Sequence, residues 1–314
     1  MDNKLVIITT VRNEEKYLTE TIHGVEAGTV KPLKWIIIDD GSTDRTLEMA
    51  EDASKFHPWI EVLHREDRGY TKFVGTDVDG FRQGLLYSDN LNYDFICKLD
   101  GDVKLPPQYI EKILQKFAAN PKLGIAGGTW LEPFNGKFRR IRTLSEFPFG
   151  GARVWRRTCF QDIAPLFTSS GWDRLDCYSA MMRGWKTEVF KDPSLESLHQ
   201  RQMASLGKSF VKQYGRDGIS SYYQGDHPIY FLSGALYRMT EPPFIKGGIG
   251  RLVGYVSAWA NRAERCNDDQ LLRYLKSWQL KKIKSELRNK IAFVFRRRKR
   301  SAVSFNSLRR GQDI

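Results

Sequence analysis

The sequence has few cysteines and no long hydrophobic runs. Only four of its 314 residues are cysteine, and no two of them form a Cys-x-x-Cys pair. Neither a zinc site with that spacing nor a disulfide framework is therefore expected. No run of about 18 apolar residues occurs, and no hydrophobic segment follows a basic start, so the sequence predicts neither a spanning helix nor a secretory signal. We expect the chain to act in the cytoplasm.

Acidic residues are scarce near the C-terminal end. The formal net charge is +13, and residues 281–300 hold ten basic side chains with Glu286 as the single acid. Most of the excess positive charge therefore lies in this tail, and the rest of the chain is only mildly basic. An anionic partner is expected for the tail, whereas a phosphate-bearing ligand held by a few residues would suit the body.

The N-terminal third alternates between apolar strands and helical patterns. Apolar runs cover residues 4–10, 35–38, 60–64 and 95–99, and apolar residues at helical spacing separate them. Four such alternations imply a mainly parallel sheet, and continuous apolar strands fit a sheet with helices on both faces. With 41% hydrophobic residues, the chain can form one large α/β domain, or one domain plus an appendage.

Carboxylates stand where these strands end. One strand leads into Asp39 and Asp40, another into Asp100 and Asp102, and Thr9 closes the first. In open parallel sheets ligands bind at this edge. Two carboxylates in one crevice stay ionised only if a cation neutralises them, and a hard divalent ion holding a phosphorylated substrate fits. An Asp-x-Asp motif alone also suits a simple turn, but the convergence of strand ends favours a site.

These motifs, in this order and spacing, resemble those of cytoplasmic, non-processive bacterial family 2 glycosyltransferases with the GT-A fold. They comprise Thr-x-Arg-Asn-Glu after the first strand, the run 39–44, the run 98–102, and a Gly-x-x-x-x-Arg-Arg region at 151–157, which lies near the acceptor in such enzymes. The resemblance reaches residue 199. It implies a GT-A domain over residues 1–230, followed by a helical, basic appendage over 231–314.

The resemblance also implies a donor site for a nucleotide-diphosphate sugar, with uridine as the expected base. A divalent ion, Mn²⁺ or Mg²⁺, would neutralise the charge that develops on the leaving diphosphate. The residues that the resemblance assigns to the nucleotide are Thr9, Arg12, Asp39, Asp40 and Asp100.

The metal ligands implied by the resemblance are Asp102 and His199. His199 follows the predicted strand 186–190 after a short loop, where similar enzymes often have a metal-binding histidine. A lone histidine is more often structural. If His199 does bind the ion, its imidazole would favour Mn²⁺ over Mg²⁺.

Sugar transfer also needs a base that takes the proton of the acceptor hydroxyl, on the far side of a ring with oxocarbenium character. Asp173 and Asp176 are three residues apart on a predicted helix, so they can share a face. The resemblance matches Asp173 to the catalytic aspartate, but Trp172 stands where such enzymes have glutamate, so both aspartates remain candidates. Alternatively, Asp173 caps the helix and Asp176 interacts with its dipole.

The C-terminal third lacks the Gln-x-x-Arg-Trp motif of processive, membrane-embedded members. The resemblance therefore implies the addition of one sugar to a glycan or lipid-linked acceptor, in polysaccharide or glycolipid biosynthesis. The pairs at 242–243 (Pro-Pro) and 247–248 (Gly-Gly) are expected to interrupt the chain before an apolar stretch over 249–259.

Apolar residues then recur at three- to five-residue intervals from Leu271 to Ile291, with lysines and arginines between them. We predict that this amphipathic segment binds the anionic inner face of the cell membrane, as a peripheral attachment. Alternatively, the segment is a helix that packs on the catalytic domain, followed by a basic end.

Two other function classes share some of these features. A sugar-phosphate nucleotidyltransferase would have the same α/β crevice and metal, but such enzymes open with a glycine-rich loop, and residues 11–14 contain no glycine. A nucleic-acid-binding protein would explain the basic tail. Against it, the carboxylate-lined rim would repel phosphate unless a metal intervened, so we expect no nucleic acid partner.

Overall fold

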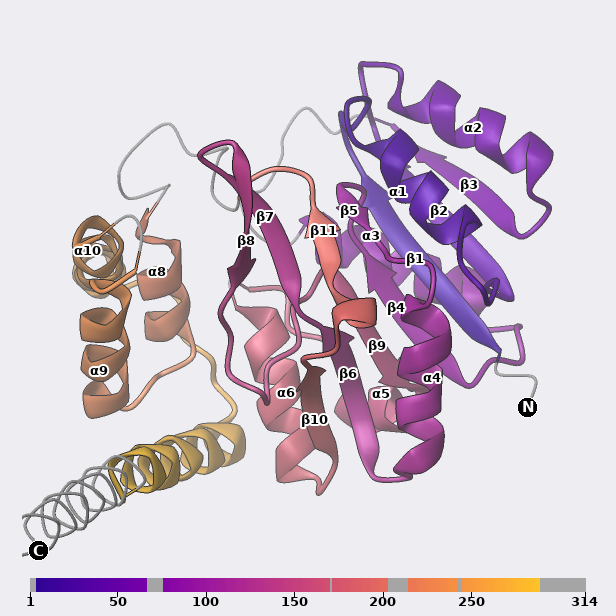
Figure 1. Cartoon of the computed structure of the whole chain (residues 1–314). Helices are drawn as coiled ribbons and strands as arrows, with labels where there is room; N and C mark the ends of the chain where they lie inside the picture. The colour runs from indigo at the N-terminus through magenta and orange to yellow at the C-terminus, as the bar shows by residue number, and fades with distance from the viewer. Residues whose placement is uncertain (1–3, 67–75, 170, 203–213, 242–243, 289–314) are drawn as a thin grey trace, which may run out of the picture.

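A seven-stranded sheet forms the centre of the molecule, with helices on both faces (Figure 1). The structure, a computed structural model, describes residues 4–66, 76–169, 171–202, 214–241 and 244–288. The strands run in the order β10-β6-β9-β4-β1-β2-β3. Their bounds are β1 (Leu5–Val11), β2 (Lys34–Asp40), β3 (Ile60–Arg65), β4 (Phe95–Leu99), β6 (Leu123–Gly128), β9 (Ala152–Arg156) and β10 (Lys186–Phe190). Neighbouring strands are parallel except at β9, which is antiparallel to β4 and β6. The predicted mainly parallel sheet is confirmed.

Each face of the sheet has its own hydrophobic core, because side chains alternate between the two faces of a strand. One core joins Leu5, Ile7 and Ile37 to helices α1, α2 and α4. The other joins Val6 and Ile8 to helices α3, α5 and α6. The helix bounds are α1 (Leu18–Glu26), α2 (Thr46–Phe56), α3 (Thr76–Ser88), α4 (Tyr109–Ala119), α5 (Arg157–Ile163) and α6 (Trp172–Met182). Both faces are covered, as the continuous apolar strands predicted.

A second, four-stranded sheet lies beside the carboxyl end of β4. Its order is β5-β11-β7-β8, with β5 (Val103–Lys104), β7 (Trp130–Phe134), β8 (Lys137–Ile141) and β11 (Ser197–His199), and a short 3₁₀ helix (Pro193–Leu195) precedes β11. Residue 103 pairs with residue 199 across β5 and β11. This pairing brings two predicted metal ligands together, since residue 102 directly precedes β5.

The C-terminal third is helical. It contains α8 (Arg216–Tyr223), α9 (Pro228–Arg238) and α10 (Lys246–Ala260), which lie beside the β7–β8 hairpin (Figure 1), and a further helix over residues 269–288. The predicted break at 247–248 is wrong, because both glycines lie within α10. They allow close packing: a Cβ on Gly248 would lie 2.5 Å from the carbonyl oxygen of Ala235 in α9.

The helix over residues 269–288 packs on the α/β domain. Leu271 and Leu275 are fully buried in the core that contains α6, and Lys282 pairs with Glu146 at 2.7 Å. The predicted helix is confirmed here. This part of its apolar face packs on the α/β domain, in agreement with the alternative in which the segment is a packed helix. Ile291 lies outside the described residues. Among the residues that the structure describes, no helix is long and apolar enough to cross a membrane.

Candidate active site

The loops after β1 and β2 are joined by hydrogen bonds. The backbone N–H of Asn13 donates to Ser42 Oγ (3.0 Å), and Asn13 Oδ1 accepts from the backbone N–H of Thr43 (2.8 Å). Asn13 has a positive φ of 56°, which asparagine tolerates better than most residues. Next to it, Arg12 Nη1 donates to the backbone oxygen of Asp40 (3.1 Å). The two strand ends therefore form one rim.

Asp39 is fully buried at this rim and has one unused acceptor. Its Oδ2 accepts from the backbone N–H of Ser42 (3.2 Å) and contacts His64 Nδ1 (2.9 Å). Its Oδ1 is buried and has no hydrogen-bond partner in the described part of the chain. A buried acceptor without a partner is costly, so it is a suitable place for the N–H group of a ligand.

Two other predicted nucleotide residues have different surroundings. Asp40 is buried, and its Oδ1 lies 3.4 Å from Arg65 Nη1. Thr9 lies in the core, where its hydroxyl accepts a hydrogen bond from Trp35 Nε1 (2.9 Å), and it has no exposed surface. Thr10, on the other face of β1, is the partly exposed threonine of this strand end.

Asp100 is more open than Asp39, Asp40 and Asp102, with 37% of its side chain exposed. Its Oδ1 pairs with the buried ammonium of Lys98. Gly151, which directly precedes β9, lies against it: a Cβ there would be 2.1 Å from Asp100 Oδ2. Only glycine at 151 leaves the carboxylate room, which explains the glycine in the predicted motif at this position.

Asp102 is buried between two cationic groups. Its Oδ2 lies 3.1 Å from His199 Nε2 and 2.5 Å from Arg201 Nε, and Arg201 Nη2 donates to Glu14 Oε1 (2.7 Å). Burial opposes ionisation of Asp102, but the hydrogen bond from His199 and the charges of His199 and Arg201 outweigh burial and lower its pKa. The ring of His199 stacks on Trp130 at 5.2 Å, which fixes its orientation.

Asp102 and His199 fit a divalent ion as a partial ligand set. Neighbouring ligands of an octahedral ion at about 2.1 Å are about 3.0 Å apart, and the two side chains offer an oxygen and a nitrogen at 3.1 Å. In the described part of the chain, no group of three or more His, Cys, Asp and Glu residues could hold a metal. The remaining ligands would have to come from a bound diphosphate or water, and Arg201 Nε would have to leave the shared carboxylate oxygen.

The two candidate bases occupy different positions on α6. Asp173 is partly exposed in the first turn, whereas Asp176 is 1% exposed and lies 3.9 Å from Nη1 of Arg153. The same Nη1 donates to the backbone oxygen of Asp173 (2.7 Å). Burial raises the pKa of Asp176 to about 8, although the charge of Arg153 acts in the opposite direction.

The glycine pair at 150–151 connects Asp173 to the rim. A Cβ on Gly150 would lie 3.5 Å from the Cβ of Asp173, and the next residue, Gly151, contacts Asp100. Asp173 and Asp100 therefore flank the same two glycines, from α6 and from the end of β4. Asp176 points to Arg153 in the interior instead.

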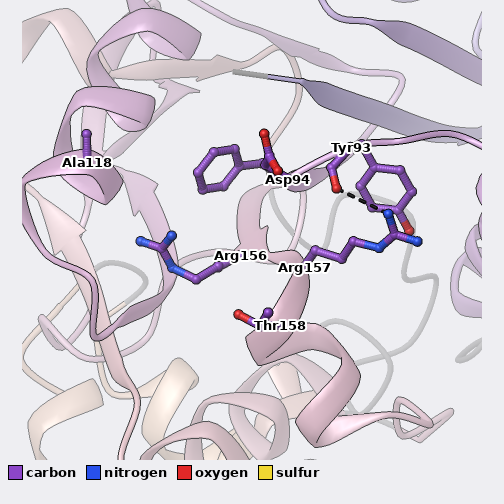
Figure 2. A pocket seen from close by; sticks show the side chains of 7 residues that line it. Tyr93, Asp94, Ala118, Arg156, Arg157 and Thr158 are labelled. Atoms are coloured by element: carbon purple, nitrogen blue, oxygen red, sulfur yellow. Dashed lines mark hydrogen bonds between the residues drawn. The ribbon is translucent and has the colours of Figure 1, made fainter. Parts of the chain in front are cut away.

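The two arginines of the 151–157 motif lie away from this rim. Arg156 pairs with Phe95 at the start of β4, whereas Ala152 pairs with Leu99 at its end. Figure 2 shows Arg156 and Arg157 at a cavity of about 340 Å³ on that opposite side. Their guanidinium groups bind backbone oxygens: Arg156 those of residues 117, 120 and 123, and Arg157 those of residues 91 and 93. The expectation that this motif lies near the acceptor is wrong for the arginine pair.

Several rim residues were not predicted. Arg201 and Glu14 form the ion pair beside Asp102, Lys98 neutralises Asp100, and Trp130 supports His199. Glu14 and Lys98 lie within the motifs at 10–14 and 98–102, and the signal for Arg201 was its position two residues after His199. It was insufficient, because the pairing with Glu14 spans 187 positions of sequence.

Solved structures with a similar fold include glycosyltransferases. The mannosyltransferase PcManGT from Pyrobaculum calidifontis, in complex with GDP-Man and Mn²⁺, superposes with a TM-score of 0.52 at 13% identity, over 82% of this chain and 74% of that one. Staphylococcus aureus TarS (residues 1–349), in complex with UDP-GlcNAc, gives 0.50 at 15% identity, over 83% and 73%. At such low identity these likenesses establish the GT-A fold alone.

Curated relatives match over part of the chain. Glycosyltransferase GlyA of Streptococcus pneumoniae is 23% identical over 116 residues, 37% of this chain and 15% of the relative. An uncharacterized glycosyltransferase of Haemophilus influenzae is 28% identical over 127 residues, 40% of this chain and 36% of the relative. The matched segment thus spans well under half the length of these relatives.

The family model described as glycosyl transferase family 2 matches residues 6–189. That range holds more than half of the chain and every predicted site residue except His199. The chain belongs to glycosyl transferase family 2.

Proposed function

We propose that this protein is an inverting, metal-dependent glycosyltransferase that moves one sugar from a nucleotide-diphosphate sugar, with UDP as the nucleotide, to a hydroxyl of a glycan or lipid-linked acceptor. The observation that carries the proposal is the set of buried carboxylates at the ends of β2 and β4, where Asp39 Oδ1 lacks a hydrogen-bond partner among the described residues and Asp102 faces His199. Polysaccharide or glycolipid biosynthesis is the corresponding role.

In this proposal the rim of β1 and β2 binds the nucleotide. Asp39 Oδ1 would accept a hydrogen bond from the imide N–H of uracil, because it is a buried acceptor without a donor among the described residues. Arg12 and Asp40, which are hydrogen-bonded to each other, would border the base, and Asp100 would bind the ribose. Thr9 would act indirectly, by fixing β1 to β2 through Trp35.

Asp102 and His199 would hold the divalent ion. When bound, the ion would neutralise the negative charge that develops on the leaving diphosphate. An imidazole in the ligand set favours Mn²⁺ over Mg²⁺. Arg201, freed from Asp102, would remain close enough to contribute positive charge to a diphosphate in the same place.

Asp173 is the proposed base. It is partly exposed and flanks the glycine pair that contacts Asp100, so its carboxylate can reach an acceptor hydroxyl beside the donor sugar. Taking that proton while the hydroxyl attacks the anomeric carbon, opposite the leaving diphosphate, gives inversion. Asp176 would hold α6 in place through Arg153.

Cytoplasmic action at the inner face of a membrane belongs to the same proposal. If the enzyme bound that surface, it and a lipid-linked acceptor would encounter each other by diffusion along the same membrane. The basic run over residues 281–300 supports an anionic surface as a partner. Nucleic acid is not proposed as a partner, since the rim of the crevice is acidic.

A thermal-shift panel of UDP-, GDP- and dTDP-sugars, with and without Mn²⁺, tests the proposal, because a ligand that binds only the native state raises the melting temperature. We expect the largest rise with a UDP-sugar plus Mn²⁺. A rise with GDP- or dTDP-sugars alone would overturn the uridine assignment. No rise with any donor would overturn the nucleotide-sugar proposal as a whole.

A further inference from the structure

Exposed hydrophobic side chains gather on α9, α10 and the segment between them. Ten of the seventeen large hydrophobic residues that are exposed in the described part of the chain lie between residues 229 and 259. They are Ile229, Leu232, Leu236, Tyr237, Phe244, Ile245, Ile249, Val253, Val256 and Trp259. Elsewhere such residues are scattered, which needs no explanation, but a concentration of this kind marks an interaction surface.

Helix α10 buries five small residues and exposes four of its large ones, Ile249, Val253, Val256 and Trp259. Its buried positions are Gly247, Gly248, Gly250, Gly254 and Ala258. The close approach requires them: a Cβ on Gly254 would lie 2.0 Å from the carbonyl oxygen of Gly215, beside α8. Val256 and Trp259 are 57% and 66% exposed. A helix of a protein surrounded by water normally turns its large apolar residues inward, whereas small residues at the packing face and large ones outside are the pattern of helices in lipid.

Helix α9 repeats this arrangement on its own outer side. Ile229, Leu232 and Leu236 follow helical spacing and are more than half exposed, whereas Phe231 and Ala235 are buried. The contacts that join the helices, Phe231 to Tyr255 (ring centres 4.4 Å apart) and Ala235 to Gly248, use the other side of each helix. The pair is therefore apolar on sides that face away from each other. Lipid can surround both sides at once, but one docked protein partner would cover only one.

The charges on and around the two helices are mostly basic, although Glu264, Asp269 and Glu286 are exposed acids in the segments that follow α10. Neither helix contains an acidic residue, and Glu241 between them pairs with Arg238 at 3.1 Å. Lys246 at the start of α10 and Arg262 just after it are exposed. In the helix that follows, the exposed basic residues are Arg273, Lys276, Lys281, Lys284 and Arg288. Such groups attract anionic head groups, and a second copy of this chain would bring the same positive charges together.

We propose that the outer faces of α9 and α10 insert into the boundary between head groups and acyl chains of an anionic bilayer. The packed helix over residues 269–288 contributes only its exposed basic residues. Aromatic side chains such as Trp259 and Tyr237 suit that boundary, because one end of each is apolar and the other polar. The inference deepens the proposed attachment to a membrane by naming the surface, and it does not depend on the identity of the donor.

Flotation of the full-length protein with vesicles of phosphatidylcholine and phosphatidylglycerol tests the surface. The double variant Val253→Asp/Val256→Asp places two charges on the exposed face of α10 and should lower the partition coefficient at least about tenfold. A control, Phe56→Asp/Leu86→Asp, changes two hydrophobic residues on α2 and α3 that are even more exposed (79% and 69%, against 39% and 57% for Val253 and Val256) and should leave binding unchanged. The assay is run at high salt, where the basic tail contributes least.

Tryptophan fluorescence gives an independent readout. Vesicles with brominated acyl chains should quench the protein's emission, and Trp259→Phe should remove most of that quenching. Equal flotation of the two double variants, or quenching unchanged by Trp259→Phe, would overturn the proposal. So would a wild-type dimer that the Val253→Asp/Val256→Asp variant makes monomeric while neither protein binds vesicles. In every arm the thermal shift with donor and Mn²⁺ reports separately on the proposed transferase site.

Discussion

The two ends of β4 both concentrate charge, but they use it differently. At the carboxyl end, Asp39 Oδ1 and His199 Nδ1 are buried without partners among the described residues. At the amino end, the guanidinium groups of Arg156 and Arg157 donate to five backbone oxygens. The carboxyl end keeps buried polar atoms that can still form hydrogen bonds. At the amino end, the arginine side chains already form hydrogen bonds that stabilise the fold.

This contrast distinguishes a ligand site from a structural one. Buried polar groups in folded proteins normally find partners within the protein, so the two atoms at the carboxyl end that lack one among the described residues are candidate positions for a ligand. The cavity of about 340 Å³ at the amino end looks like a site by shape, but its arginines are already engaged. The charge and shape of a cavity are therefore weaker indicators of a ligand site than buried polar atoms that lack a hydrogen-bond partner.

The largest expected difference in turnover comes from replacing one aspartate at each end of β4 with alanine. Asp102→Ala should lower transfer about a thousandfold or more, because the ligand shared with His199 is lost and a bound ion supplies several kcal/mol of charge stabilisation. Asp94→Ala, at the other end of the same strand, should leave turnover unchanged. Steady-state release of the nucleotide measures both. Comparable turnover in the two variants would contradict the assignment of the ligand site to the carboxyl end of β4.

The proposed base gives the next largest effect. Asp173→Asn keeps the size of the side chain but cannot accept a proton, so turnover should fall about a hundredfold with donor binding retained. Asp176→Asn provides the comparison from the same helix and should cost much less activity. If Asp176→Asn causes the large loss and Asp173→Asn the small one, the two roles must be exchanged.

At the amino end, Arg156→Met should affect stability and not catalysis. The substitution keeps most of the stem but leaves backbone oxygens of residues 117, 120 and 123 without their donor, which should lower the free energy of unfolding by about 2–3 kcal/mol. Denaturant titration measures this, and turnover per folded molecule should match the wild type. Lost turnover at unchanged stability would place this end in the active site.

The smallest effect concerns the pH dependence of stability. Burial raises the pKa of Asp176 from its ordinary value of 3.8 to about 8 in the folded protein. A carboxyl group with a raised folded-state pKa stabilises the fold below about pH 4, and this contribution is lost as the pH rises towards 8. Relative to the wild type, Asp176→Asn should therefore gain at least about 1 kcal/mol between pH 5 and pH 8. A constant difference across that range would mean that Asp176 stays ionised beside Arg153.

The sequence predicted the parts of the fold that follow a regular period. Strands β1, β2 and β4 are continuous apolar runs, and the positions of Asp39, Asp40, Asp100 and Asp102 at their ends follow directly. The second sheet was missed, because strands of two to five residues carry no readable alternation. Because this sheet was not predicted, the sequence also did not explain why His199 lies next to Asp102.

The rest depended on long-range packing. Continuous apolar strands do not reveal which face each residue takes, so the pattern could not distinguish Thr9 in the core from Thr10 at the surface. Gly247 and Gly248 read as a break, but they serve a close helix contact. Leu271 and Leu275 suited lipid and protein equally until the packing against α6 was known.

The most direct test of the central claim is an anomalous difference map, at the manganese edge, from crystals grown with UDP and Mn²⁺. We predict one peak about 2.2 Å from both Asp102 Oδ2 and His199 Nε2, with the diphosphate beside it, the uracil N–H on Asp39 Oδ1, and Arg201 Nε displaced. A nucleotide bound in the cavity at Arg156 and Arg157, or a peak that does not touch Asp102, would contradict the account.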